Sequence, residues 1–322
     1  MLKSPIVDGQ PDRAPRLQWE AEQLVSASLA AELIGLQFPR LSGAQVELLA
    51  TGWDNTVYLA GGQWVFRFPR REVALPGIQR EIAILPRLAR HLPLPVPVPE
   101  LIGTPSGAYP WPFWGARLIA GTELAEAELP DSARAQAGAS AGRFLRALHH
   151  PHLAEVAGPG EPGLPEDPMQ RADPRIRAAR AREPLERLAR LAAWIPDPAI
   201  ERLFGEAGGL GPPAGRPVLA HGDLHLRHLL VGESGDASGV IDWGDICLAD
   251  PAVDLSLAYS GFAGPARAAL LAAYGPVDAE RELRARVLAV SVCASLAEYA
   301  FSDGRARLLR ESLAGLRRAV AG

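Results

Sequence analysis

The predicted secondary structure of this 322-residue chain changes character at Gly121. Before it, short strand-like runs predominate, at residues 45–51, 56–60, 63–68, 100–104 and 113–119. After it, longer helical patterns predominate, at residues 131–149, 175–194, 251–259, 265–274, 279–300 and 306–321. A sheet-rich first part followed by a larger helical part predicts an α+β fold of two lobes with a cleft between them.

Smaller features complete this outline. Residues 19–35 have helical spacing that stops at a glycine, and Gly61-Gly62 indicates a hairpin between two strands. A helix at 76–92 is expected to open at Pro76 and to be interrupted at Pro86. Within the helical part, short strands are expected at 218–220, 229–231 and 239–242, and loops at 158–168 and 205–217.

Charge and apolar patterning argue against several classes of protein. The formal net charge is −4, whereas a nucleic-acid binder normally carries a basic excess. The N-terminus lacks the apolar core of a secretory signal, and the longest apolar run, 287–297, is too short to span a membrane. We therefore expect a cytoplasmic protein with buried free thiols at Cys247 and Cys293. Because Lys3 is the only lysine, none is available for catalysis in the body of the chain.

The stretch LAHGDLHLRHLLV, residues 219–231, places three histidines and one aspartate within eight residues. A metal hydrolase built on His221, Asp223, His225 and His228 is one interpretation. Zinc sites, however, commonly draw their ligands from well-separated segments. The remaining histidines are His91 and the group at 149–152, for which we expect structural roles, and none follows His228. The hydrolase interpretation also leaves the residues after this stretch unexplained.

A phosphoryl-transfer site explains more of the sequence. Asp223 is followed at the fifth position by His228, the separation of the acceptor-facing aspartate and the metal ligand in kinase catalytic loops. In GVIDWGD, Asp242 precedes Trp-Gly in the manner of an Asp-Phe-Gly metal loop. Upstream, WVFRFP puts Arg67 on the strand where a kinase carries its phosphate-binding lysine. We predict that Arg67 forms an ion pair with Glu81 of the next helix.

With these motifs in order, the chain resembles the aminoglycoside phosphotransferase family, which has a protein-kinase-like fold and phosphorylates small molecules. The resemblance rests on TGWDNTVY (51–58), WVFRFP, the helix with Glu81, HGDLHLRHLLV and VIDWGDICLADPAVDL (240–255), and covers about residues 45–300. It implies a small antiparallel-sheet N-lobe at 17–116, a hinge at 117–122 and a larger, mainly helical C-lobe at 123–322, after an N-terminal arm at 1–16.

The resemblance also implies roles for the polar residues of the two loops. Asp223 would be the catalytic base and Asp242 the main magnesium ligand. His228 stands where most members have asparagine, and macrolide phosphotransferases are similar to this chain in having histidine there. His221 and Asp254 are expected to brace the catalytic loop. For His225, loop packing and substrate contact remain equal alternatives.

On the nucleotide side, the resemblance implies that Arg67 replaces the usual lysine and pairs with Glu81. The turn in TGWDNTVY would cover the nucleotide with its backbone amides, through Gly52, Asp54, Asn55 and Thr56. It lacks a full G-x-G-x-x-G pattern. Backbone groups from Arg117 to Ile119 would form the hinge that meets adenine. The implied cofactors are ATP and Mg²⁺, with GTP and Mn²⁺ as alternatives.

The implied function is ATP-dependent transfer of the γ-phosphoryl group to a hydroxyl of a small molecule, either an antibiotic such as a macrolide or aminoglycoside, or a metabolite. Antibiotic resistance would follow in the first case. A catalytically weak, pseudokinase-like nucleotide-binding regulator is the alternative. We expect a monomer, with a dimer as the alternative, and neither a nucleic-acid nor a membrane partner.

The sequence leaves the chemical class of the acceptor open. Aminoglycosides are polycations and need carboxylates around the acceptor pocket. Residues 171–190 instead carry seven arginines against three acidic residues. If they line the acceptor cleft, a polycation is disfavoured, but a solvated helix face is the alternative interpretation. Four acidic residues on the later helices offer a site for a cation: Asp278, Glu282, Glu298 and Asp303.

Overall fold

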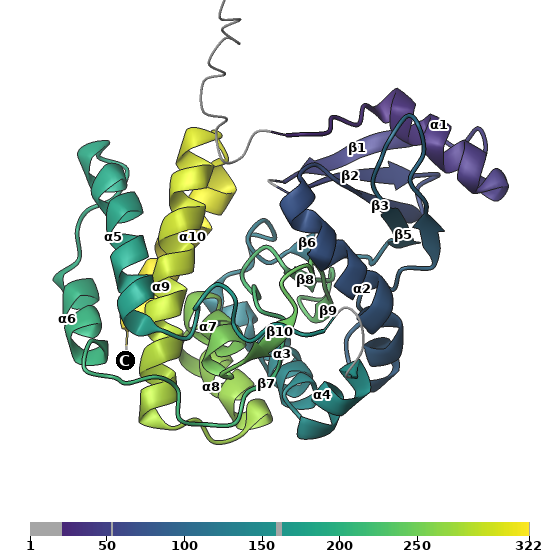
Figure 1. Ribbon diagram of the computed structural model, residues 1–322. Coiled ribbons are helices and arrows are strands. Elements are labelled where there is room, and N and C mark those ends of the chain that lie inside the picture. Colours follow the sequence, from purple (N-terminus) through teal and green to yellow (C-terminus); the bar gives the residue numbers. More distant parts are fainter. Residues whose placement is uncertain (1–20, 53, 159–162, 322) are drawn as a thin grey trace, which may run out of the picture.

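The computed structural model describes residues 21–52, 54–158 and 163–321, which form two lobes (Figure 1). The smaller lobe contains a five-stranded antiparallel sheet with the order β1-β2-β3-β5-β4. Its strands are β1 (Val46–Thr51), β2 (Asn55–Ala60), β3 (Trp64–Pro69), β4 (Leu101–Gly103) and β5 (Phe113–Arg117). All five were predicted, and the hairpin turn between β2 and β3 falls at Gly61-Gly62 as expected. The predicted N-terminal arm lies outside the described residues.

Each face of this sheet packs against one helix, because successive side chains of a strand point to opposite faces. On one face, Phe113 joins an aromatic core with side chains of α1 (Ala27–Gln37). On the other, Trp114 and Ala116 contact Ile78 of α2 (Leu75–Leu88). The sheet therefore holds α2, which carries Glu81, directly beside β3, which carries Arg67.

Two N-lobe helices differ from prediction. The helix expected at 19–35 begins only at Ala27, where the Ser26 hydroxyl accepts a hydrogen bond from the Leu29 N–H at 3.2 Å and caps the first turn. Before it, the backbone N–H groups of residues 22 and 23 donate to the Arg70 carbonyl, which holds that segment against the sheet. Pro86 does not interrupt α2, since it lies in the last turn and removes only one of the helix's hydrogen bonds.

The larger lobe is mainly helical. Its helices are α3 (Ala135–Leu148), α4 (Pro151–Ala157), α5 (Pro174–Arg190), α6 (Pro198–Ala207), α7 (Ala252–Ser260), α8 (Gly264–Tyr274), α9 (Ala279–Ser302) and α10 (Ala306–Val320). Short 3₁₀ turns occur in both lobes, at Pro39–Leu41, Glu72–Ala74, Ala89–His91 and Asp131–Ala133. Helices α4 and α6 were not predicted, although each begins with a proline in its first turn. By length and composition α9 could cross a membrane, but it packs against α5, α7 and α10 as a core helix does.

Two small sheets of the C-lobe position the predicted catalytic segments. In one, β6 (Thr122–Glu123), β8 (Leu229–Val231) and β9 (Ala237–Val240) lie in the order β6-β8-β9. In the other, β7 (Val218–Ala220) pairs with β10 (Cys247–Ala249). Residues 221–228 connect β7 to β8, and residues 241–246 connect β9 to β10, so the two loops lie side by side. The strand predicted at 239–242 ends at Val240, which leaves Asp242 in the loop.

Both cysteines are free and buried, as predicted. Burial raises the pKa of the Cys247 thiol and of the Cys293 thiol to about 12. Neither thiol is therefore a nucleophile at neutral pH.

Candidate active site

Asp254 on α7 fixes the start of the predicted catalytic loop. Its carboxylate accepts hydrogen bonds from the backbone N–H groups of His221, at 2.7 Å, and Gly222, at 3.0 Å. The Nε2 atom of His149 lies 3.1 Å from the same carboxylate. Burial favours the neutral acid, but these donors and the nearby imidazoles hold the pKa of Asp254 below its usual value. The predicted structural roles of Asp254 and His149 are confirmed.

His221 ties the catalytic loop to the metal loop. Its Nε2 lies 3.0 Å from the carbonyl oxygen of Ile241, and its Nδ1 accepts from the Asp223 N–H at 3.3 Å. Burial lowers the pKa of His221, which favours the neutral ring with Nε2 as the donor. Next to it, Gly222 has φ of 89°, and a Cβ there would lie 2.1 Å from the carbonyl oxygen of Asp245. Only glycine allows this approach of the two loops.

Arg67 connects the two lobes. Its Nη1 lies 3.2 Å from Glu81 Oε1, as predicted, and its Nη2 donates to Asp242 Oδ1 at 2.7 Å. The second contact was not predicted. Glu81 is fully buried and also accepts hydrogen bonds, each of 3.1 Å, from Trp114 Nε1 and the Trp243 N–H. The N-lobe strand, the N-lobe helix and the metal loop therefore meet at one guanidinium.

Charge at this junction favours an ionised metal-loop aspartate. Burial alone would raise the pKa of Asp242, but Arg67 and His228 hold it well below its usual range. Burial alone would lower the pKa of Arg67, but Asp242 and Glu81 raise it above its usual value. For Glu81, burial wins over the opposing effect of Arg67 and raises the pKa to about 7.

This raised pKa predicts a pH-dependent contribution to stability. In the unfolded chain Glu81 returns to its ordinary value of 4.5, so between pH 4.5 and about 7 the folded state retains a proton that the unfolded state has lost. The proton stabilises the folded state at low pH, and this contribution is lost as the pH rises through that window. We expect the Tm of the wild type to fall more between pH 5 and pH 8 than that of Glu81→Gln.

The exposed Glu280 at the start of α9 provides the control, because Glu280→Gln should leave the wild-type profile unchanged. Parallel Tm curves for the wild type and Glu81→Gln would contradict the assignment.

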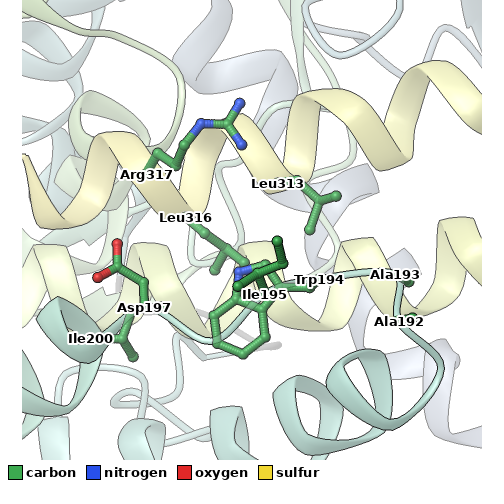
Figure 2. Close-up of a pocket in the computed structure, with 9 residues that line it drawn as sticks. All are labelled: Ala192, Ala193, Trp194, Ile195, Asp197, Ile200, Leu313, Leu316 and Arg317. Atoms are coloured by element: carbon green, nitrogen blue, oxygen red, sulfur yellow. The ribbon is translucent and has the colours of Figure 1, made fainter.

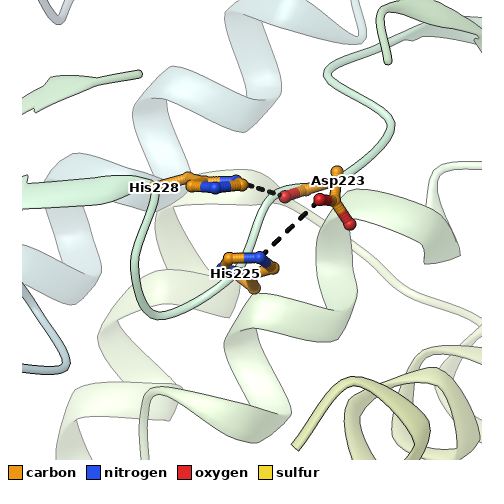
Figure 3. Close-up of side chains that lie close together, drawn as sticks. All are labelled: Asp223, His225 and His228. Carbon is orange, nitrogen blue, oxygen red and sulfur yellow. Dashed lines mark hydrogen bonds and ion pairs between the residues drawn. The ribbon is translucent and has the colours of Figure 1, made fainter. Parts of the chain in front are cut away.

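His228 presents one ring nitrogen to Asp242. Its Nδ1 lies 2.8 Å from the carbonyl oxygen of Asp223 and must be the donor, so the neutral ring carries its lone pair on Nε2 (Figure 3). That Nε2 lies 3.5 Å from Asp242 Oδ2. Two ligands of one divalent cation, each bonded at roughly 2.1 Å, lie about 3–4 Å apart. Asp242 and His228 therefore fit a shared metal ion.

The backbone of Asp242 supports this role. Its φ is 66°, in a region that residues other than glycine rarely adopt. Strain of this kind is retained at functional sites where surrounding contacts enforce it. Here the contacts with Arg67 and His228 hold the carboxylate between the two lobes.

His225 packs within the loop. Its ring stacks on His228 with centroids 3.8 Å apart, and its Nδ1 accepts from the Arg227 N–H at 3.2 Å. Burial lowers the pKa of His225 well below its usual value, so the ring is neutral and its proton is on Nε2. That Nε2 lies 3.6 Å from Asp223 Oδ2 (Figure 3). Ligand atoms of Asp223, His225 and His228 lie within 4.8 Å of one another, but this tautomer presents a donor and not a lone pair. The geometry favours loop packing for His225 and weakens the hydrolase interpretation.

Arg171 is a site residue that the sequence did not single out. It precedes α5, and its Nη2 lies 3.0 Å from Asp223 Oδ1 and 2.8 Å from Asp245 Oδ2. Burial alone would lower the pKa of Arg171, but these two carboxylates raise it above its usual value. The only sequence signal was the arginine-rich segment that begins here. Further along α5, Arg182 and Arg187 pair with acidic residues at half-exposed positions, as on a solvated helix face.

The predicted nucleotide-covering turn is partly closed by its own hydrogen bonds. The N–H of Gly52 donates to the Asn55 carbonyl at 2.9 Å. This amide is therefore not available to the phosphates, contrary to the prediction. The Asp54 carboxylate pairs with Arg71, and Thr56 is buried in β2. Trp53 lies outside the described residues. A two-stranded turn without a full glycine pattern satisfies its own backbone groups, which explains the difference for Gly52.

At the predicted hinge, the side chain of Arg117 packs against residues of the N-lobe sheet and its β2–β3 turn. Its guanidinium lies 4.0 Å from the ring centroid of Trp64 and donates to Gln63 Oε1 at 3.1 Å. The Leu118 N–H donates to the Gln63 carbonyl at 2.8 Å. Within the described residues, the backbone of Ile119 makes no hydrogen bond. The backbone of Ile119 is therefore one part of 117–122 that remains free to meet a base, and the hinge assignment stays a prediction.

A separate concavity lies between α10 and the connection from α5 to α6 (Figure 2). Its lining includes Trp194, Ile195 and Leu316. None of the residues that line it belongs to the predicted site. We assign it no part in the reaction.

Comparison with known proteins gives a family match over most of the chain. Residues 45–286 match the model of the phosphotransferase enzyme family. The uncharacterized protein YcbJ of Bacillus subtilis (strain 168) is 29% identical over 269 residues, which cover 76% of this chain and 81% of that protein.

Two solved structures share the fold. The GDP complex of wild-type aminoglycoside 2'-phosphotransferase-IIIa is 23% identical, with a TM-score of 0.65 over 92% of this chain and 99% of that chain. Macrolide 2'-phosphotransferase MphH from Brachybacterium faecium is 25% identical, with a TM-score of 0.56 over 89% of this chain and 97% of that chain. The predicted two-lobed, kinase-like fold is confirmed.

Proposed function

Because the chain belongs to the phosphotransferase enzyme family, we propose that this small-molecule kinase transfers the γ-phosphoryl group of ATP to a hydroxyl with Asp223 as its base. The observation that carries this proposal is a series of contacts between the lobes that joins four residues. Arg67 contacts Asp242, Asp242 faces His228, and His228 is hydrogen-bonded to the backbone of Asp223. A pseudokinase-like regulator is not favoured.

The reaction follows from these positions. The acceptor oxygen forms a bond to the γ-phosphorus while the bond from that phosphorus to the β–γ bridging oxygen breaks, and Asp223 takes the hydroxyl proton. Arg67 donates to the nucleotide phosphates from the N-lobe side. A Mg²⁺ or Mn²⁺ ion held by Asp242 and His228 would neutralise charge on the phosphates. The protein's work is positioning and charge stabilisation.

Several finer assignments belong to the proposal. The backbone near Ile119 meets the base of ATP, with GTP as the alternative nucleotide, since a fold relative was solved with GDP. The acceptor is an antibiotic or a metabolite with a free hydroxyl, and resistance would follow only in the first case. We place the enzyme in the cytoplasm as a monomer.

The test is a coupled assay of ADP release with aminoglycosides, macrolides and simple metabolite alcohols as acceptors, with phosphorylated products detected by mass spectrometry. GTP replaces ATP in a parallel series. We expect at least one acceptor to be phosphorylated in a Mg²⁺- or Mn²⁺-dependent reaction. If nucleotide binds but neither an acceptor nor water is phosphorylated, the regulator alternative would replace this proposal.

His228 provides a test of the metal site. Imidazole is a softer ligand than an amide oxygen, so it favours Mn²⁺ over Mg²⁺ more than asparagine does. We expect the ratio of kcat with Mn²⁺ to kcat with Mg²⁺ to be several-fold higher in the wild type than in His228→Asn. The affinity for Mn²⁺ in the presence of ADP, measured by electron paramagnetic resonance, should change in the same direction. An unchanged ratio and affinity would leave His228 as a loop-packing residue.

A further inference from the structure

Arg171 reaches the predicted base from a rigid loop. The segment before α5 is fixed to β10, because Leu248 donates to the Pro165 carbonyl at 2.9 Å and accepts from the Asp167 N–H at 2.9 Å. The Asp167 carboxylate in turn accepts from the backbone N–H groups of Arg171 and Ala172, both at 2.8 Å. The position of Arg171 is therefore set by the fold.

Most of the donors of Arg171 remain available. Both of its contacts, to Asp223 at 3.0 Å and Asp245 at 2.8 Å, come from Nη2. Its Nε and Nη1 have no partner among residues 21–52, 54–158 and 163–321. A guanidinium offers five N–H donors in a planar fork and no acceptor. A group that lies beside an acceptor hydroxyl at Asp223 would therefore meet unused N–H donors and a permanent positive charge.

Three carboxylates on this side of the C-lobe are paired with arginines, and a fourth, Asp303, accepts only from the Tyr299 hydroxyl, at 3.3 Å, among the described residues. Tyr299, near the C-terminal end of α9, contacts Arg227 of the catalytic loop, so this end of the helix faces the site. The nearby carboxylates form ion pairs with arginines: Glu123 with Arg227 at 3.0 Å, Glu126 with Arg305 at 2.8 Å, and Glu298 with Arg187 at 2.8 Å.

Two of the acidic residues considered for cation binding are remote from the site. Asp278 caps the N-terminus of α9 and pairs with Arg281, and Glu282 lies in the first turn and pairs with Arg286. At 1.5 Å per residue, Asp278 is roughly 30 Å along the helix from Glu298. An ammonium group beside Asp223 would lie next to the guanidinium of Arg171, whose charge is shared between Asp223 and Asp245, and it could not accept from the free N–H donors of Arg171.

We propose that Arg171 determines acceptor specificity, and this rests on the proposed function. It selects acceptors in which the reactive hydroxyl is flanked by an oxygen function, such as a second hydroxyl, a carbonyl or a carboxylate. It rejects acceptors in which an ammonium group flanks that hydroxyl. Oxygen lone pairs accept from Nε and Nη1, whereas an ammonium group offers no acceptor and leaves these donors without a partner. The substrate class is a polyol, hydroxy ketone or hydroxy acid rather than an aminoglycoside.

The first experiment compares matched acceptors by coupled ADP release. Ethylene glycol with ethanolamine, glycerol with 3-amino-1,2-propanediol, and glucose with glucosamine are the pairs. We expect the wild type to prefer the oxygen-flanked member at least about tenfold in kcat/KM. Arg171→Gln should lower kcat/KM for the oxygen-flanked acceptor about 10–100-fold, the effect of losing a hydrogen bond to a charged group. Arg180→Gln, at an exposed position of α5, should change neither value.

The second experiment requires no turnover. Kanamycin binding to the Mg²⁺–ADP form is measured by calorimetry for the wild type and for Arg171→Glu, Arg171→Lys and Arg180→Glu. We expect kanamycin to bind at least tenfold more tightly to Arg171→Glu than to the other three, with an unchanged Kd for ADP showing that each protein is folded. Equal kanamycin affinities, or a preference for amine-flanked acceptors in the wild type, would overturn the role of Arg171. Absence of both phosphotransfer and ATP hydrolysis would instead overturn the proposed function.

Discussion

Replacing Asp223 by asparagine should lower kcat for phosphoryl transfer about 10²–10⁴-fold, the usual contribution of a positioned general base. An amide has the shape of the carboxylate but cannot take the proton of the acceptor hydroxyl. The nucleotide contacts assigned to Arg67 and Asp242 lie in other segments, so the Kd for ADP should stay within a few-fold of the wild-type value. Single-turnover kinetics and calorimetry measure the two quantities separately.

Asp245→Asn provides the matched control. Asp245 also binds the Nη2 of Arg171 and is more exposed than Asp223. It lies outside the loop that carries His228, and the reaction assigns it no proton. We expect its loss of kcat to be at least tenfold smaller than that of Asp223→Asn. Equal losses would mean that Asp223 and Asp245 both act through their charge beside Arg171 and that Asp223 is not the base.

The parts of the site that could be predicted from the sequence are those with a fixed spacing within one segment or a fixed place in the order of elements. Asp223 and His228 are five positions apart, and the loop between β7 and β8 brings them together. Arg67 and Glu81 lie on a strand and on the helix that follows it, and their ion pair was predicted and is present. Such relations depend on local geometry that a motif already contains.

Contacts between distant segments could not be predicted in this way. The Nη2 of Arg171 reaches Asp223 because the loop before α5 is hydrogen-bonded to β10, a strand that was itself not predicted. The contact of Arg67 with Asp242 joins residues 175 positions apart. Both of these contacts arise from tertiary packing, for which a single sequence carries no periodic signal. The tautomers of His225 and His228 are set locally, by backbone groups two and five positions away, but they depend on the exact course of the loop.

The second large effect is expected at the junction of the lobes. At pH 8, above the pKa of about 7 that Glu81 has in the wild type, Arg67→Met would leave Glu81 buried without its cation, and breaking a buried ion pair in this way typically costs about 3–5 kcal/mol of folding stability. In the double variant Arg67→Met/Glu81→Gln, no buried charge is left unpaired at position 81. Trp114 Nε1 and the Trp243 N–H donate to different oxygens of Glu81 in the wild type, and the single glutamine oxygen can keep one of these two hydrogen bonds. We therefore expect the double variant to regain part of the lost free energy of unfolding.

Nucleotide binding should not recover with stability. The guanidinium that we assign to the phosphates is absent from both variants, so the KM for ATP should rise at least tenfold in each, while the KM for the acceptor stays near the wild-type value. Arg67→Lys keeps a positive charge but not the fork that contacts Glu81 and Asp242 at once, and should fall between these variants and the wild type. Chemical denaturation gives the stability and steady-state kinetics give both KM values. If the double variant regained ATP affinity together with stability, Arg67 would act only through the fold and not at the nucleotide.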